Sequence, residues 1–234
     1  MRLAITRPQA DGERTAAMLR ARGHQALVAP LMMVEPVVAD LGRGWAAVVF
    51  TSANAPGAIA AHSASATLIK LPAYAVGRRS ADAARAAGFA DVTSAGGDVR
   101  DLVRLIAERH ADAKGPLLYL AGEDRATDLT AELAAHGIAA EMRVVYRAVT
   151  APYPSALTAA LEAGAIDAVL HFSKRSADNY LAGARAAGIA EKALAPRQLC
   201  LSAQVAAPLQ NGGARNVRIA ARPDEAALID LVTT

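Results

Sequence analysis

The sequence has few cysteines, few aromatic residues and no long apolar run. Its single cysteine, Cys200, excludes an intramolecular disulfide framework and is typical of a reducing compartment. Aromatic residues make up 4% of the chain, which favours helices packed on a Val/Leu/Ile sheet over a β-sandwich. No stretch approaches roughly 18 uncharged apolar residues, and the apolar run before Arg7 and Pro8 is too short for a signal peptide. We therefore expect a cytoplasmic protein that does not bind a membrane.

Basic runs and cofactor motifs are absent as well. The chain carries 25 Lys and Arg against 22 Asp and Glu, a net charge of +3 that favours an anionic ligand without requiring nucleic acid. The glycines at 96–97 and 212–213 do not form the Gly-x-Gly-x-x-Gly turn of a nicotinamide-dependent reductase. The five histidines show no metal spacing, so we expect them at the surface or at helix ends and expect no metal site.

The chain does contain short apolar runs that alternate with alanine-rich helical patterns. Residues 3–6 read as a strand, residues 9–22 as a helix ended by Gly23, and residues 26–29 as a second strand. This βαβ opening predicts parallel pairing. The further expected strands are 46–50, 73–76, 117–120, 168–172 and 199–201. The pattern predicts an α/β protein with parallel sheets covered on both faces.

The layout of the chain repeats. The segment "LAITRPQADGERTAAMLRARGHQALVAP" resembles "LLYLAGEDRATDLTAELAAHGIAAEMRV", and "VVFTSANAPGAI" with its continuation resembles "VLHFSKRSADNYL" with its continuation. The repeats follow each other in the order A, B, A′, B′. Two similar α/β domains are therefore expected, each with a hydroxyl residue after an aromatic at the end of a buried strand.

Two extended runs, at 31–38 and 142–149, indicate the link between these domains. Pro36 places the first run at an edge or a connector, because proline cannot donate to a sheet ladder. If the two runs pair, the domain borders follow. We expect domain one at 1–33 plus 150–234, domain two at 38–143, and linker strands at 34–37 and 144–149.

A series of short motifs gives the chain a family resemblance. The motifs are "ITRP" at 5–8, "FTSANA" at 50–55, "AVGRRSA" at 75–81, "GEDR" at 122–125 and "VVYRAV" at 144–149. Their order and spacing resemble uroporphyrinogen-III synthase over nearly the whole chain. The resemblance implies two α/β domains joined by a two-stranded linker, with the substrate in a cleft between them.

The resemblance also implies a reaction. The family cyclises a linear tetrapyrrole, hydroxymethylbilane, with loss of water and inversion of the last pyrrole ring, and it uses no metal or organic cofactor. The substrate carries two carboxylates on every pyrrole ring and closes unaided to the wrong isomer. We expect a monomer, with the preceding pathway enzyme as a candidate partner. The alternative is a non-enzymatic two-domain protein of the same fold that binds small anions or has a regulatory role, since fold does not determine function.

Hydroxyl residues after the expected strands are the candidate carboxylate ligands. A serine or threonine there lies beside free backbone N–H groups at the positive end of a helix dipole. The hydroxyl candidates are Thr6, Thr51, Ser52, Ser80, Ser173 and Ser202, and the matched motifs add Gly77 and Gly122. The alternative for each hydroxyl is a plain N-cap. The chain departs from the family pattern at 202–205 and at Lys174.

One tyrosine and two arginines complete the candidate site. Tyr146 matches the family's tyrosine in the linker strand, and its phenol can donate a proton to the departing hydroxyl group. Its alternative role is a pairing residue of the ladder. Arg7 and Arg125 lie in corresponding loops, where their forks of donors could hold propionates. Most surface arginines are merely solvated, which is what we expect first of Arg79 and Arg175.

Overall fold

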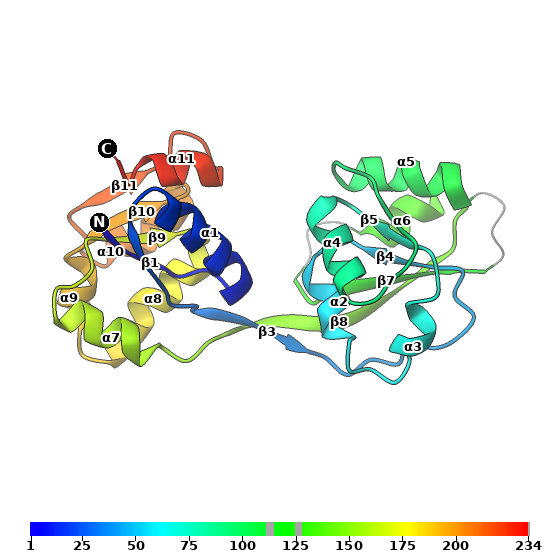
Figure 1. Cartoon of the computed structure of the whole chain (residues 1–234), viewed down its shortest axis with the longest axis horizontal. Coiled ribbons are helices and arrows are strands. Elements are labelled where there is room, and N and C mark those ends of the chain that lie inside the picture. The colour runs from blue at the N-terminus through cyan, green and yellow to red at the C-terminus, as the bar shows by residue number, and fades with distance from the viewer. Residues whose placement is uncertain (111–114, 125–127, 234) are drawn as a thin grey trace. The chain divides into compact units, whose positions relative to one another are not determined.

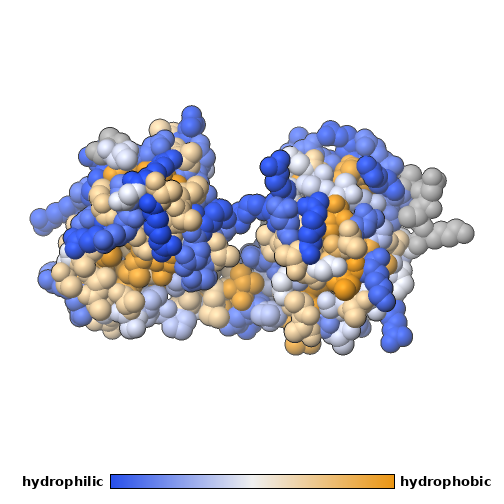
Figure 2. Space-filling model, in the orientation of Figure 1, coloured by the Kyte–Doolittle hydropathy of each residue, from blue (hydrophilic) through white to orange (hydrophobic). Residues whose placement is uncertain are grey.

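The fold is known from a computed structural model, which describes residues 1–110, 115–124 and 128–233 (Figure 1). The chain divides into two compact units. Unit 1 combines Met1–Met33 with Val149–Thr234, and unit 2 is the continuous stretch Val34–Ala148. Hydrophilic side chains cover much of the viewed face of each unit (Figure 2). No helix in the described ranges is long and apolar enough to cross a membrane.

The sheet of unit 1 pairs its strands in parallel, as the βαβ pattern predicts. Its strands lie in the order β11-β10-β9-β1-β2. They are β1 (Arg2–Ile5), β2 (Gln25–Val28), β9 (Ala168–His171), β10 (Arg197–Cys200) and β11 (Val217–Ile219). Successive side chains point to opposite faces, so Leu3 and Ile5 enter one apolar core and Ala4 enters the other.

Helices cover both faces of this sheet. The face with Leu3 and Ile5 packs against α1 (Gln9–Ala21) and α11 (Glu225–Asp230). The opposite face is covered by α7 (Ser155–Glu162), α8 (Lys174–Ala186), α9 (Ala190–Leu194) and α10 (Ala203–Asn211). A parallel sheet buried on both faces explains why its central strands β1 and β9 consist mainly of apolar residues.

Unit 2 has the same design with one added strand. Its strands lie in the order β3-β8-β7-β4-β5-β6. They are β3 (Met32–Pro36), β4 (Ala47–Phe50), β5 (Ala73–Ala75), β6 (Val92–Ser94), β7 (Leu117–Gly122) and β8 (Ala140–Thr150). One face packs against α2 (Asn54–Ala58), α3 (Ser65–Leu68) and α4 (Arg78–Ala86). The other packs against α5 (Val99–His110) and α6 (Leu129–Ala134).

The sequence repeat becomes a structural repeat. In unit 1 the B′ strands β9, β10 and β11 join the A strands β1 and β2. In unit 2 the B strands β4, β5 and β6 join the A′ strands β7 and β8 in the same arrangement. Each unit therefore combines one half of each repeat, and the prediction of two similar parallel α/β domains is confirmed.

The two-stranded linker is formed by β3 and β8, which are neighbours in the sheet. The N–H of Val37 donates to the carbonyl of Val145, and the N–H of Ala151 donates to the carbonyl of Leu31, so the strands run in opposite directions. Both chain crossings between the units lie on these strands. Pro36 ends β3, which is last in the strand order, and an edge is where proline is tolerated.

Candidate functional site

The strand order reverses once in each sheet, and these two reversals mark candidate ligand sites. In unit 1 the reversal lies between β1 and β9, and in unit 2 it lies between β4 and β7. Open parallel sheets bind ligands outside the carboxyl ends of their strands at such a reversal. The predicted residues Thr6, Ser173, Thr51 and Gly122 end or follow these four strands. The reversals thus bring residues of distant motifs to the same sheet edges.

Thr51 and Ser52 occupy the carboxyl end of β4 in unit 2. The hydroxyl of Thr51 lies 2.8 Å from the hydroxyl of Tyr119, which belongs to β7. The Oγ of Ser52 accepts a hydrogen bond from the backbone N–H of Asn54 at 3.2 Å. Both residues are half-buried. Each hydroxyl therefore has a structural contact and still lies at the edge where a ligand is expected.

Tyr146 reaches the same edge because β8 contains an irregularity. Ala121 pairs with Val144 while Gly122 pairs with Tyr146, so Val145 is an extra residue of β8, as in a β-bulge. A methyl group on Gly122 would lie 2.7 Å from the Tyr146 hydroxyl, so the ring rests on this glycine. The N–H of Glu123 donates to the Tyr146 carbonyl at 3.0 Å. Tyr146 is thus a ladder residue whose phenol lies at the end of β7.

Gly77 and Ser80 both belong to the start of α4. Gly77 is the N-cap, with an extended φ of −149°, and a methyl group on it would meet no atom within 4 Å. Its backbone therefore does not require glycine. Ser80 is a helical residue with 5% exposure, so the expectation that it is a strand-end hydroxyl is corrected. Its side chain has little access to solvent, and its contact with substrate stays a prediction.

Thr6 joins the two sides of the reversal in unit 1. It is fully buried, and its hydroxyl donates to the backbone carbonyl of Leu170 on β9 at 3.0 Å. The proton of this hydroxyl is donated inside the sheet, and the expectation that Thr6 holds a substrate carboxylate stays a prediction. Its contact holds the ends of β1 and β9 together.

Arg7 also makes contacts within unit 1. Its guanidinium lies 2.7 Å from the carboxylate of Glu225 and 3.5 Å from that of Asp11. It also lies 4.1 Å from the centre of the Phe172 ring, within cation–π range. Two carboxylates already lie beside its charge, and the expectation that Arg7 grips a propionate stays a prediction. Arg125, its expected counterpart, lies outside the described residues.

Ser173 and Ser202 are N-cap residues of two helices of unit 1. The Oγ of Ser173 accepts from the N–H of Ser176 at 3.1 Å, so it caps α8. Ser202 caps α10 by position, and its side chain makes no capping hydrogen bond. Both are partly exposed. Ser202 therefore offers both its hydroxyl and the first N–H groups of α10 to a ligand, although this turn departs from the family pattern.

One histidine contradicts the expectation of surface or helix-end positions, because His171 is fully buried at the end of β9. His110 is 7% exposed and is the last residue of α5, a helix-end position as expected. The Nε2 of His171 lies 2.9 Å from the amide oxygen of Gln198. Burial lowers the pKa of His171 to about 4, so its imidazole is neutral near pH 7. Its contact with Gln198 joins the end of β9 to β10.

Tyr119 is the residue at this edge that the sequence did not single out. It has 3% exposure and lies within the apolar run "LLYLAG" of β7. A buried tyrosine normally finds a partner for its hydroxyl. A tyrosine in a strand that ends at the candidate site was therefore the available signal, and its partner proves to be Thr51.

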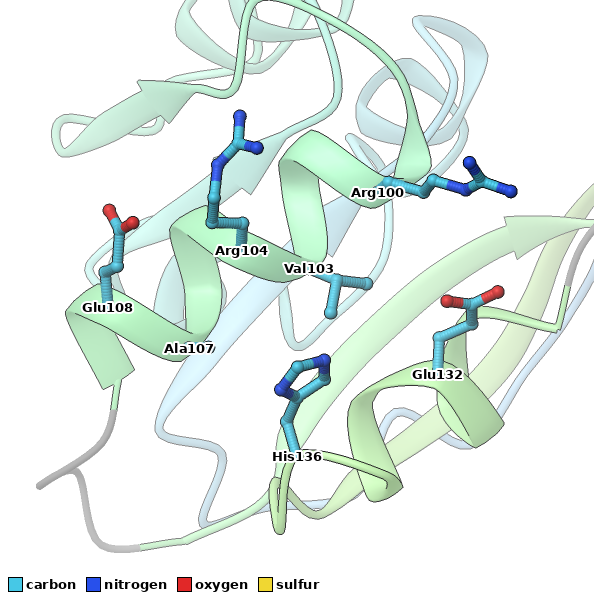
Figure 3. A pocket seen from close by; sticks show the side chains of 7 residues that line it. All are labelled: Arg100, Val103, Arg104, Ala107, Glu108, Glu132 and His136. Atoms are coloured by element: carbon cyan, nitrogen blue, oxygen red, sulfur yellow. The ribbon is translucent and has the colours of Figure 1, made fainter.

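A cavity of about 560 Å³ lies elsewhere in unit 2, along α5 and α6. Figure 3 shows Arg100, Arg104 and Glu108 on α5, with Glu132 and His136 on the facing segment. Its lining includes both charge signs and none of the predicted site residues. Within the described residues, no three His, Cys, Asp or Glu side chains group as metal ligands. The sheet edges therefore remain the candidate site.

A family model described as uroporphyrinogen-III synthase HemD matches residues 13–230. The chain belongs to the uroporphyrinogen-III synthase family. The resemblance seen in the sequence motifs is thereby confirmed. The family match and the fold support the predicted function, and no comparison favours the non-enzymatic alternative.

A solved structure of this family shares the fold. The structure of uroporphyrinogen-III synthetase from Helicobacter pylori has 20% identity and a TM-score of 0.64, and the alignment covers 100% of this chain and 99% of that one. Uroporphyrinogen III synthase from the extremely thermophilic bacterium Thermus thermophilus has 20% identity and a TM-score of 0.44, with 100% and 95% covered. The comparison with curated protein sequences gives no match. The first structure supports the α/β fold over the full length of the chain.

Proposed function

We propose that this chain is a hydro-lyase that cyclises hydroxymethylbilane to uroporphyrinogen III, with loss of water and inversion of the last pyrrole ring. The family match over residues 13–230 carries the proposal. The placement of hydroxyl and backbone donors at the carboxyl edges of both sheets supports it, because the substrate is rich in carboxylates.

Substrate carboxylates are held by the N-terminal turns of helices at these edges. In unit 2 the donors are the Thr51 and Ser52 hydroxyls with the first N–H groups of α4 behind Gly77. In unit 1 they are Ser173 and Ser202 with α8 and α10. Backbone N–H groups and helix dipoles bind anions without arginine. This agrees with the pairing of Arg7 to Glu225 in the protein itself.

Tyr146 is the proton donor for the departing hydroxyl group of the substrate. Its phenol lies at the carboxyl end of β7, next to the strand reversal of unit 2. Protonation of the leaving oxygen releases water and gives an electrophilic azafulvenium cation, which the substituted carbon of the last ring attacks to form a spiro intermediate. The original bond from that carbon to its methylene then breaks, the methylene joins the ring at its free α-carbon, and the proton lost there returns to the phenolate. A positioned acid contributes roughly 10²–10⁴-fold to such a step.

Orientation of the substrate supplies the larger part of the selectivity. Free hydroxymethylbilane closes to the type I isomer, so the protein must hold the chain bent while the last ring inverts. Holding the reacting atoms of the substrate close together in this way lowers the entropy that must be lost on reaching the transition state. Several points stay predictions. They are the substrate cleft between the domains, activity without a metal or organic cofactor, the monomeric state, the cytoplasmic location and hand-over of substrate from the preceding enzyme.

The test is product analysis. Purified protein without added cofactor is mixed with enzymatically made hydroxymethylbilane, and the oxidised porphyrin is separated into isomers. The proposal expects the type III isomer, while heat-unfolded protein gives type I. Type I product at high concentrations of folded protein would overturn the proposal.

A further inference from the structure

Two hydroxyl groups from different strands meet at the strand reversal of unit 2. Tyr119 is paired in register with Val49, and Thr51 follows two residues later on the same face of the sheet. Their hydroxyl oxygens are 2.8 Å apart, an ordinary O–H···O distance. Tyr119 has 3% exposure, whereas Thr51 is half-buried at the edge. The contact thus links an interior hydroxyl to one that a ligand can reach.

Chemistry favours one direction for this hydrogen bond. A phenol is a stronger acid than an aliphatic alcohol, so the tyrosine is the better donor and the threonine the better acceptor. With the Tyr119 proton directed at Thr51, the Thr51 proton is left to donate elsewhere. A carboxylate that accepts this proton completes a chain of two hydrogen bonds in which each polarises the other.

We propose that Tyr119 is a positioning residue that orients the Thr51 hydroxyl as a donor to a substrate carboxylate. This inference rests on the proposed function and adds a specific contact to it. The β-branched side chain of Thr51 has few rotamers, and the buried ring of Tyr119 is fixed by the core between β7 and α5. The donor is therefore in place before substrate binds, which lowers the entropy lost on binding.

A double-mutant cycle tests the inference. Tyr119→Phe removes the phenol hydroxyl, and Thr51→Val removes the threonine hydroxyl with little change of shape. KM and kcat for the type III isomer are measured for wild type, both single variants and the double variant. We expect KM to rise about five-fold in each single variant, the size of one lost hydrogen bond, with a smaller change in kcat. Adding Tyr119→Phe to Thr51→Val should change KM by less than about two-fold.

A matched control separates this role from packing. Tyr74→Phe also removes a phenol hydroxyl from a buried tyrosine on the same face of the sheet, without touching Thr51. It should keep the wild-type KM. Circular dichroism and thermal unfolding confirm that each variant folds. The inference would be overturned if Tyr119→Phe kept the wild-type KM. It would also be overturned if Tyr119→Phe raised KM by the same factor in wild type and in Thr51→Val.

A binding measurement separates this inference from the proposed function. Uroporphyrin, which carries two carboxylates on each pyrrole ring, is titrated against each protein and followed by fluorescence. If wild type binds it and makes no type III isomer, the proposed function fails while the inference is decided by the Kd values. The inference is supported if Tyr119→Phe raises the Kd for uroporphyrin in wild type but not in Thr51→Val. Equal Kd values in all four proteins, or no binding by wild type, would overturn it.

Discussion

The ring of Tyr146 rests on Gly122, so that a methyl group on this glycine would come within 2.6 Å of the ring carbon Cζ. Gly122→Ala should therefore displace the phenol and lower turnover by roughly 10–100-fold, because small displacements of a catalytic group are costly. Turnover of the type III product gives the measurement. Gly57→Ala is the matched control, since a methyl group there meets no atom within 4 Å. Equal rates in both variants would show that the contact does not position Tyr146.

Removal of the Tyr146 hydroxyl is expected to reduce the rate more than removal of any single edge hydroxyl. Tyr146→Phe should retain activity, because water can partly replace the phenol as a donor. Thr51→Ala and Ser173→Ala should each lose about 1 kcal/mol of binding, since backbone N–H groups share the task. Rates at saturating substrate give the comparison. A wild-type rate in Tyr146→Phe beside a collapsed hydroxyl variant would place the proton donor elsewhere.

The ion pair of Arg7 and Glu225 is expected to stabilise unit 1. Glu225→Gln should lower the free energy of unfolding by about 1–3 kcal/mol, because the Arg7 side chain is only 14% exposed and loses a charged partner. Urea denaturation measures the loss. Glu13→Gln is the control, since its pair with Arg20 is half exposed and 3.4 Å long, and should change stability by less than about 1 kcal/mol. Equal stability of both variants would contradict the structural role of Arg7.

The buried His171 is expected to make the protein less stable in acid. Its pKa is lowered from 6.5 to about 4 by burial, so the unfolded chain binds the proton first as the pH falls. This contribution to stability is complete above about pH 6.5 and is lost between pH 6.5 and pH 4, on the order of 3 kcal/mol.

His171→Gln isolates this effect, because the glutamine amide extends to the position of the histidine Nε2 and can still donate to Gln198. Urea denaturation of wild type and variant at pH 7 and pH 5 gives the difference in acid sensitivity. The variant should be less stable at pH 7 and should lose less stability on acidification. The same loss in both proteins would show that His171 does not titrate between these pH values.

Local patterns in the sequence predicted the repeat and most of the strands, but they missed the short strands β6 and β11. Apolar runs such as 168–172 alternate with helical stretches, and this signal lies within each element. The partners of Thr6 and Arg7 could not be predicted in this way. Leu170 is 164 residues from Thr6, and Glu225 is 218 residues from Arg7, because unit 1 joins the two ends of the chain. The sequence pattern does not show which side chains of the candidate loops are used inside the protein.

The face of the sheet on which Tyr146 lies was harder to predict than its place among the candidate residues. A regular ladder would pair Gly122 with Val145 and turn Tyr146 to the other face, since side chains alternate along a strand. The irregularity at Val145 shifts the register by one residue, so Gly122 pairs with Tyr146 instead. No residue in "VVYRAV" signals it, because a bulge depends on the pairing of two strands. The contact of Tyr119 with Thr51 likewise depends on which strands become neighbours.

The isomer ratio as a function of protein concentration tests the account most directly. Hydroxymethylbilane is held at one concentration, the folded protein is varied over several decades without added cofactor, and the oxidised product is separated into type I and type III. The account predicts that type III rises from the unaided background to nearly all product as catalysis outpaces unaided closure. A ratio that stays at the unaided value at every protein concentration would contradict it.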